Sequence, residues 1–172
     1  FFRKSVDYAQ LKSLEENTFK ALQRYEIFDG DLCVSIAGSI GHFALLRPPP
    51  DVRVILTENA LRIKMDASKV VPEYLCSVLN SYWTQRQIDS EKGTGGGVPK
   101  LALFRVQSLQ VAVPKSVGEQ ALISEKIAGL EKYLNAEKAT IKKLKALKAA
   151  LMQDLLTGKR RVSSLIEACQ SG

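Results

Sequence analysis

The sequence predicts a mixed α/β (α+β) domain over residues 1–117, one long coiled-coil α-helix over 118–158 and a short basic tail over 159–172. Three observations predict this organisation. Short apolar, β-branched runs bounded by glycine and proline alternate with helical patterns in the first part. An apolar repeat of about 3.5 residues then continues to the tail. With 172 residues, of which 45% are hydrophobic and 25% charged, the chain suits one domain plus an appended element.

The first elements are expected to be a helix and a β-hairpin. Residues 8–17 have helical apolar spacing, with Asp7 as the N-cap. Asp29-Gly30-Asp31 predicts a turn, after which the apolar run 32–37 predicts a strand that Gly38 closes. The run 42–46 is expected to pair back on that strand.

The middle of the chain predicts more strands and one helix. The three prolines at 48–50 lack the amide protons that a ladder needs, so they predict an extended surface connection. Strands are expected to resume over 52–56 and 60–65. The segment 72–89 starts with proline, which a first helical turn tolerates, and its apolar residues, Tyr82 included, fall at helical spacing. We therefore expect a single helix there.

A glycine-rich segment over 91–100 comes after this helix, and it lets the backbone approach a partner closely. It fits a mobile surface loop and a nucleic-acid contact loop about equally. A phosphate-binding loop is not indicated, because no Lys-Ser or Lys-Thr comes after the glycines. The strand-like pieces 101–104 and 109–113 are expected to complete the domain.

The long helix has signals at both ends and a seam along its length. Ser116 and Glu119 have the spacing of a capping box, and Gly158 is placed for a left-handed C-terminal cap. Alternating steps of four and three residues trace a coiled-coil seam in which Glu137 and Lys148 are the polar members. The predicted interface residues are apolar: Ile123, Ile127, Leu130, Leu134, Ile141, Leu144, Leu151 and Leu155.

At about 1.5 Å per residue this helix spans roughly 57 Å, too long for a domain of ordinary radius to cover its seam. The tail over 159–172 is too short to supply a second helix. We therefore expect the seam to be covered by another copy or another subunit. The lysine-rich stretch 138–153 fits both a solvated face and a contact to DNA or to a partner.

Composition favours a binding protein over an enzyme. A formal charge of +7 favours polyanionic partners through counterion release. The three cysteines are scattered, so neither disulfides nor zinc are indicated, and no cofactor is expected. His42 is the only histidine and is more typical of a packed or surface residue than of a general base. The sequence lacks a membrane-spanning run and a signal peptide, so we expect a cytoplasmic protein.

Several stretches, taken together, resemble the specificity subunits of type I restriction-modification systems. They occur in the order used by that family, from about residue 27 to 162, and the last of them is the most specific. The matching stretches are 30–32 with 35–41, 109–114 with 119–120 and Ile123, and 144–148 leading into 151–159.

The resemblance implies a target recognition domain and a conserved helix that forms an antiparallel coiled coil and docks methyltransferase subunits, and through them the restriction subunit. Such a subunit selects the double-stranded DNA sequence, while methyl transfer and ATP-driven cleavage belong to other polypeptides. Complete members carry two domains and two helices, so this chain corresponds to one half. The start of its recognition domain is expected to precede Phe1.

For DNA contact we predict polar and basic residues in turns, in the helix and in the glycine-rich segment. Phosphate contacts would position the domain and base-edge contacts would specify the sequence. The alternative is a coiled-coil scaffold or inhibitor whose domain binds protein and no DNA; an enzyme with an unfamiliar site is a third possibility. The predicted DNA-binding residues are Ser39, His42, Arg86, Lys92, Thr94 and Lys100.

Overall fold

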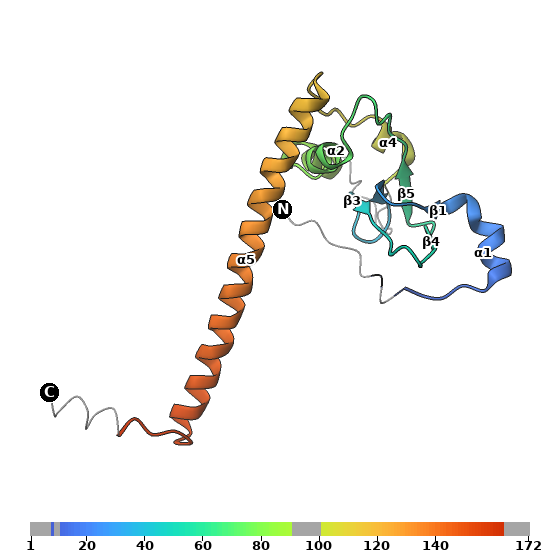
Figure 1. Ribbon diagram of the computed structural model, residues 1–172. Coiled ribbons are helices and arrows are strands. Elements are labelled where there is room, and N and C mark those ends of the chain that lie inside the picture. Colours follow the sequence, from blue (N-terminus) through green and yellow to red (C-terminus); the bar gives the residue numbers. More distant parts are fainter. Residues whose placement is uncertain (1–7, 9–10, 91–100, 164–172) are drawn as a thin grey trace. The chain divides into compact units, whose positions relative to one another are not determined.

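The structure is a computed structural model that describes residues 8, 11–90 and 101–163 (Figure 1). The chain divides into two compact units, residues 1–124 and 125–172. The first is a mixed α+β unit with small antiparallel sheets, and the second contains most of a long helix, so the predicted fold class is confirmed at this level.

Two antiparallel sheets form the framework of the first unit. In the three-stranded sheet, β2 (Asp31–Ser35) lies between β3 (Phe43–Leu46) and β5 (Ala60–Ile63). In the two-stranded sheet, β1 (Glu26–Ile27) pairs with β4 (Val54–Ile55). The predicted hairpin between β2 and β3 is confirmed, and the triple proline lies outside both sheets.

The core lies on both faces of β2. Leu32 and Val34 contribute to the main apolar cluster, together with residues of the helices. Cys33 points to the other face and joins a smaller cluster that includes Ile27 and Leu46. Because successive residues of a strand point to opposite faces, the uninterrupted apolar run in β2 supplies both clusters.

The first helix is displaced from the predicted position. Helix α1 (Glu16–Leu22) begins at Glu16, and residues 11–15 are not helical, so the prediction of a helix over 8–17 is wrong there. Phe19 is buried, and the guanidinium carbon of Arg53 lies 3.9 Å from its ring centroid. Tertiary packing of Phe19 thus outweighs the apolar spacing that the residues before it show. A 3₁₀ turn (Gln23–Tyr25) links α1 to β1.

The helix predicted to run unbroken to position 89 is two helices, α2 (Pro72–Leu79) and α3 (Tyr82–Ser90). Asn80 ends α2 because its side-chain amide binds strand β3. Its Nδ2 donates to the Phe43 carbonyl at 2.8 Å, and its Oδ1 accepts from the Phe43 amide at 3.2 Å. The break changes the direction of the second helix. Tyr82 is therefore 53% exposed, whereas the predicted single helix would have placed it on the same apolar face as the residues of α2.

The first strand predicted after the glycine-rich segment is also wrong. The amide of Leu101 donates to the carbonyl of Ile36 at 2.9 Å, which extends the pairing of β2 by one bond. The chain then turns into helix α4 (Leu103–Gln107). Leu101 itself is buried in the main cluster, so a single anchoring residue takes the place of a strand.

The second predicted strand, over 109–113, is not a strand either. A side chain occupies the place where a neighbouring strand would lie. The side-chain Nε2 of Gln87 donates to the backbone carbonyl of Gln110, and its Oε1 accepts from the backbone amide of Gln110, both at 2.9 Å. One glutamine therefore satisfies the two backbone groups that a ladder would have paired.

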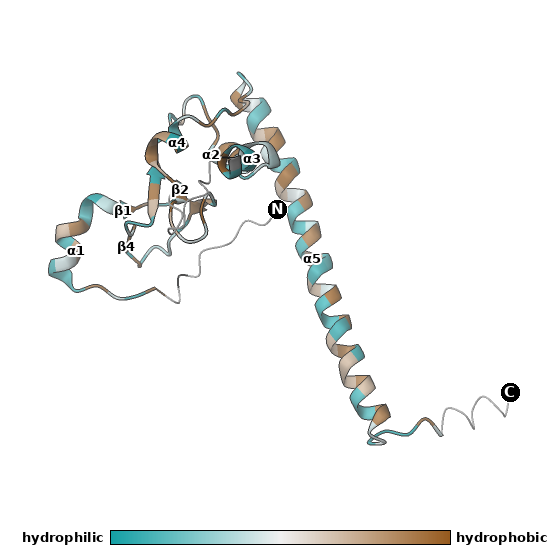
Figure 2. Cartoon of the chain, turned by 180° about the vertical axis from the view of Figure 1, so that it is seen from behind, coloured by the Kyte–Doolittle hydropathy of each residue, from teal (hydrophilic) through white to brown (hydrophobic). Residues whose placement is uncertain are grey.

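Helix α5 (Val117–Leu156) is 40 residues long, which confirms the predicted long helix. The Ser116 hydroxyl accepts from the Glu119 amide at 3.3 Å at its start. At its end Gly158 has a φ of +74° and donates to the Leu155 carbonyl. Hydrophobic residues recur along this helix among hydrophilic ones, as the hydropathy colours show (Figure 2). None of the described helices is both long and apolar enough to span a bilayer.

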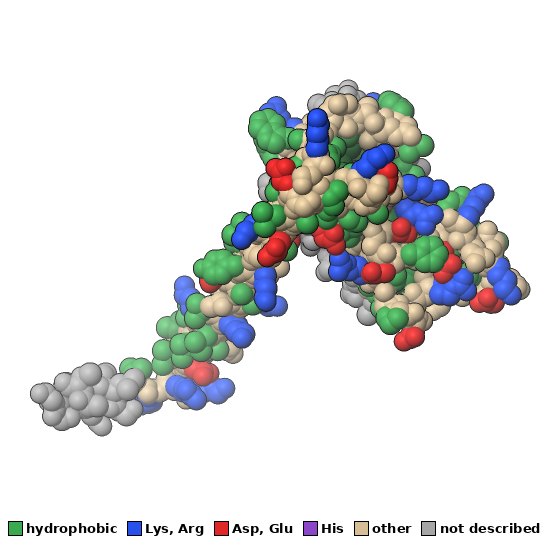
Figure 3. All heavy atoms as spheres, turned by 45° about the horizontal axis from the view of Figure 1, so that its top comes forward, with side chains coloured by type: hydrophobic (Ala, Val, Ile, Leu, Met, Phe, Trp, Pro, Cys, Tyr) green, Lys and Arg blue, Asp and Glu red, His purple; other side chains and the backbone are tan. Residues whose placement is uncertain are grey.

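Acidic and basic side chains alternate over the face of the first unit seen in Figure 3. Glu26 and Arg53 form a two-bonded ion pair at 2.8 and 3.1 Å. The hydrogen bonds from Arg53 lower the pKa of Glu26 below its ordinary value. Arg62, on β5, binds both Asp31 on β2 and the Glu26 carbonyl on β1, so this arginine links the two sheets.

Candidate functional site

The turn between β2 and β3 carries two predicted DNA-binding residues, Ser39 and His42. Gly38 and Gly41 have φ values of +69° and +78°, which let the chain reverse tightly. The Ser35 hydroxyl donates to the Ser39 carbonyl and accepts from the His42 amide, the latter at 3.2 Å. These bonds brace the turn internally, while Ser39 and His42 are exposed.

The turn is packed against helix α3. The Gln85 side chain donates to the carbonyl of Gly41 at 2.8 Å and to that of Leu79 at 3.0 Å. A β-carbon at Gly41 would lie 3.0 Å from a methyl carbon of Ile88, so this close approach needs glycine. Ile40 anchors the turn in the main cluster. The turn and α3 therefore form one braced surface, here called the turn–helix surface (residues 38–42 and 82–86).

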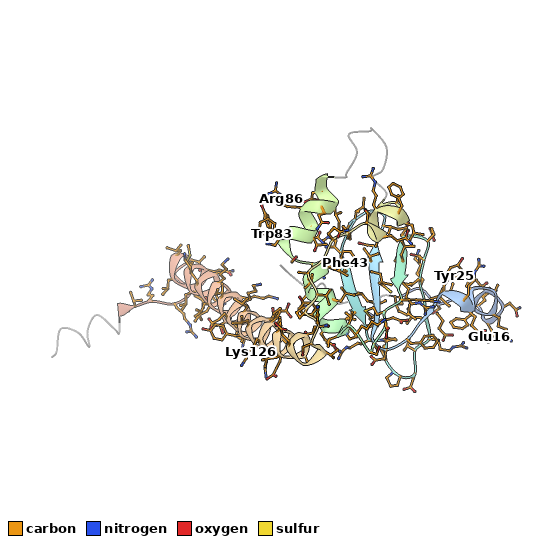
Figure 4. The ribbon with its side chains drawn as sticks, turned by 90° about the horizontal axis from the view of Figure 1, so that it is seen from above. Glu16, Tyr25, Phe43, Trp83, Arg86 and Lys126 are labelled. Atoms are coloured by element: carbon orange, nitrogen blue, oxygen red, sulfur yellow. The ribbon has the colours of Figure 1, made fainter. Side chains whose placement is uncertain are left out.

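Arg86 lies on the outer side of α3 next to two aromatic residues. Its guanidinium carbon is 5.7 Å from the Tyr82 ring centroid, and the Tyr82 and Trp83 rings meet edge to face at 5.5 Å. Trp83 is 74% exposed. Figure 4 shows Trp83 and Arg86 side by side, directed away from the ribbon. The structure thus brings the helix of Arg86 against the turn of Ser39 and His42.

Sequence reasoning missed Trp83. The available signal was the adjacent pair Tyr82 and Trp83. Neighbouring residues of a helix point about 100° apart, so the buried face of a helix rarely accommodates both, and one of the two is expected to be exposed. It also missed Leu103 and Phe104, which are exposed on α4, in a segment predicted to be a strand. Arg105 lies over the Phe104 ring at 5.6 Å, a second arrangement of arginine on an exposed aromatic.

Three of the predicted DNA-binding residues, Lys92, Thr94 and Lys100, lie outside the described residues. Within the described part of the chain, no group of histidine, cysteine and acidic residues is arranged to hold a metal ion. Burial raises the pKa of the Cys33 thiol to about 12, so it remains protonated and is a poor nucleophile at neutral pH. The chemistry that the turn–helix surface offers is hydrogen bonding, charge and aromatic stacking.

The second candidate site is the apolar face of α5 in the second unit. From Leu130 onward, every predicted apolar interface residue is exposed, between 43% for Leu155 and 64% for Leu130. Ile123 and Ile127 are half-buried. Near the helix end, a shallow apolar groove is lined by residues of α5 alone: Leu144, Leu147, Lys148, Leu151, Met152, Leu155 and Leu156.

Two large residues broaden this face beyond the predicted seam. Tyr133 is 63% exposed and Leu147 is 56% exposed, and both flank the seam on the same edge of the helix. A single helix with so wide an apolar face has the character of one half of an interface.

Comparison with protein-family models found no match to this chain, and comparison with curated proteins found none either. The two surfaces described above are therefore the basis for assigning a function.

Proposed function

We propose that this chain is a sequence-specific DNA-recognition module of the kind found in type I restriction-modification specificity subunits. In this proposal the first unit reads one half of a bipartite target in double-stranded DNA. Helix α5 assembles the module with an equivalent helix and docks methyltransferase subunits. The chain performs no catalysis itself, and the chemistry belongs to its partners.

The observation that carries the DNA-reading part is the turn–helix surface. Ser39 and His42 come from one turn and Arg86 comes from helix α3; their backbones belong to one braced surface, and all three side chains are exposed. Arginine binds guanine edges and phosphates with two hydrogen bonds, while serine and histidine pair with several base edges or phosphates. Trp83 adds an exposed ring of the type that stacks on or wedges between bases.

The charge and the exposed helix support the same proposal. A formal charge of +7 favours association with a polyanion. The exposed apolar face of α5 favours assembly, which a reader of a two-part site needs in order to carry two recognition units. The resemblance over residues 27–162 supplies the identity of the larger partners, the methyltransferase subunits.

The test is selection of bound duplexes from random DNA by the 172-residue chain. Binding to the selected sequence is then measured over a range of salt concentrations. We expect one preferred half-site and a binding constant that falls steeply with salt. His42→Ala with Arg86→Ala should weaken binding to the selected duplex by tenfold or more, since each lost base contact costs about 1 to 3 kcal/mol.

A matched control is Lys20→Ala, which removes one positive charge from α1, at the other end of the first unit from Trp83 and Arg86 (Figure 4). It should leave the preference unchanged. Selection of no sequence, together with salt-independent behaviour, would refute the DNA-reading part.

A second candidate function is a protein-binding scaffold, and the exposed apolar residues Trp83, Leu103 and Phe104 favour it. In that case these exposed residues would bind a protein, with little dependence on salt. The same salt series separates the two functions.

A further inference from the structure

A hydrogen bond between Gly41 and Gln85 joins the two stretches that carry the predicted DNA-binding residues of the turn–helix surface. The side-chain Nε2 of Gln85 donates to the Gly41 carbonyl at 2.8 Å. His42 comes directly after Gly41 in the sequence. Arg86 likewise comes directly after Gln85. Because the two residues expected to read DNA each lie one position from an end of this bond, the bond limits how far apart their backbones can move.

A second bond from the same amide fixes the direction of the Gln85 side chain. Its Nε2 also donates to the carbonyl of Leu79, the last residue of α2, at 3.0 Å. The last carbonyls of a helix have no partner within that helix, so this bond also serves α2. Both protons of a side-chain amide are used in this way. Gln85 is therefore held at two points and cannot turn away from Gly41 without breaking a hydrogen bond.

The other contacts of the turn constrain its position along α3 less strongly. The Ser35 hydroxyl binds backbone groups of the β2–β3 hairpin itself, which sets the shape of the turn. Ile40 is buried in the main cluster, and methyl groups of Ile88 lie close to Gly41. Apolar contacts are non-directional, so they resist separation of the two surfaces more than sliding between them. The directional bond from Gln85 therefore sets the offset between the turn and the helix.

We propose that Gln85 is a positioning residue for DNA recognition, which fixes the spacing between His42 and Arg86 and thereby the sequence that the turn–helix surface prefers. The inference rests on the DNA-reading part of the proposed function and deepens it. In this role Gln85 acts through its neighbours and contacts no base. Base-edge contacts require donors and acceptors at a defined separation, whereas phosphates recur along every duplex. Loss of Gln85 should therefore reduce discrimination between duplexes more than it reduces binding to DNA in general.

The test is the specificity ratio, defined as the binding constant for the selected duplex divided by that for a random duplex of equal length. Gln85→Met removes both donors and keeps an unbranched, flexible side chain. The ratio should fall about tenfold or more, which is the discrimination that one misplaced base contact costs. The salt dependence of binding to random DNA should stay the same, because no phosphate contact is removed. Partial unfolding cannot imitate this result, since it lowers both binding constants by the same fraction.

A second variant and a matched control complete the binding experiment. Gln85→Glu keeps the shape of the side chain, but its carboxylate has no donor and faces carbonyl oxygens, so it should lower the ratio at least as much. Gln87→Met makes the same substitution on the same helix, and Gln87 binds the backbone of Gln110, which lies outside the turn. This control should leave the ratio unchanged. An unchanged ratio in both Gln85 variants, or an equal fall in the control, would overturn the proposal.

A distance measurement without DNA examines the positioning role separately. Spin labels on Ser39→Cys and Trp83→Cys, in a chain that also carries Cys169→Ser, report the offset between the turn and α3. Cys33 and Cys76 are buried and should not react with the label.

The distance distribution between the two labels should be narrow with Gln85 in place and broader or shifted in Gln85→Met. An unchanged distribution would overturn the positioning role, whatever DNA the chain selects. A changed distribution in a chain that selects no duplex would refute the DNA-reading part of the proposed function and leave the hold of Gln85 on the turn standing. The two failures are therefore distinguishable.

Discussion

At the residue scale, the turn–helix surface depends on positions where one small or polar side chain permits a close approach. Gly41 combines a left-handed φ of +78° with the nearby methyl groups of Ile88. Gly38 has a similar φ of +69°, but a β-carbon there would meet nothing within 4 Å. Substituting Gly38 therefore tests the energetic cost of the backbone conformation alone, whereas substituting Gly41 adds the cost of a steric clash.

Gly41→Ala should destabilise the first unit by about 2 to 4 kcal/mol, because the left-handed conformation and the overpacked methyl group both oppose it. Gly38→Ala should cost about 1 kcal/mol, since only the conformational cost applies. Urea unfolding monitored by circular dichroism measures both. Equal losses for the two variants would contradict the packing of the turn on α3.

At the element scale, side-chain amides fasten helices to neighbouring backbone. Asn80 ends α2 on strand β3, and Gln87 binds the backbone of Gln110. Gln120 does the same for the first turns of α5, which belong to the first unit. It is fully buried; its Oε1 accepts from the Val71 amide at 2.8 Å, and its Nε2 donates to the carbonyls of Lys69 and Pro114 at 2.9 and 2.8 Å.

Gln120→Ala should cost about 2 to 4 kcal/mol of stability in the first unit, because it leaves buried backbone groups without partners and opens a cavity. Gln153→Ala, on the exposed part of the same helix, should change stability by less than about 0.5 kcal/mol. Urea midpoints of the two variants give the comparison. A small loss for Gln120→Ala would mean that the start of α5 is not held by this residue.

At the scale of the whole molecule, the proposed assembly through the exposed apolar face of α5 would make stability depend on protein concentration. The 30 residues or so of α5 beyond the first unit are exposed on nearly all sides, so an isolated copy has little to stabilise that part of the helix. In the proposed assembly, pairing would supply the missing burial, and anything that binds the folded form raises its melting temperature by mass action.

The melting temperature of the helical signal should therefore rise by several degrees when the concentration increases a hundredfold. Leu144→Asp should remove this dependence, because it places a charge inside the seam. Ala146→Asp on the outer face is the control and should retain the dependence. Circular dichroism melts at two concentrations measure the effect, and a concentration-independent original chain would contradict assembly through α5.

Patterns that concern near neighbours in sequence were sufficient for part of this fold. The hairpin of β2 and β3, the proline connection, the first-turn position of Pro72 and the long α5 with its Gly158 end were all predicted, because period, turn residues and caps act over a few residues. The apolar seam of α5 likewise depends only on the positions of its residues along one helix.

Contacts between segments that are distant in sequence determined the rest of the fold. Asn80 breaks a helix because strand β3 offers it backbone partners, and Gln87 takes the place of a strand partner for Gln110. The helix and strand propensities of Asn80 and Gln87 do not predict either contact, because each bonding partner lies 23 or more positions away in the sequence. The exposure of Trp83 and the packing of the Ser39–His42 turn on α3 result from that helix break. A local pattern therefore sets where a helix or turn is favourable, while long-range hydrogen bonds and packing decide where it ends and which side chains remain exposed.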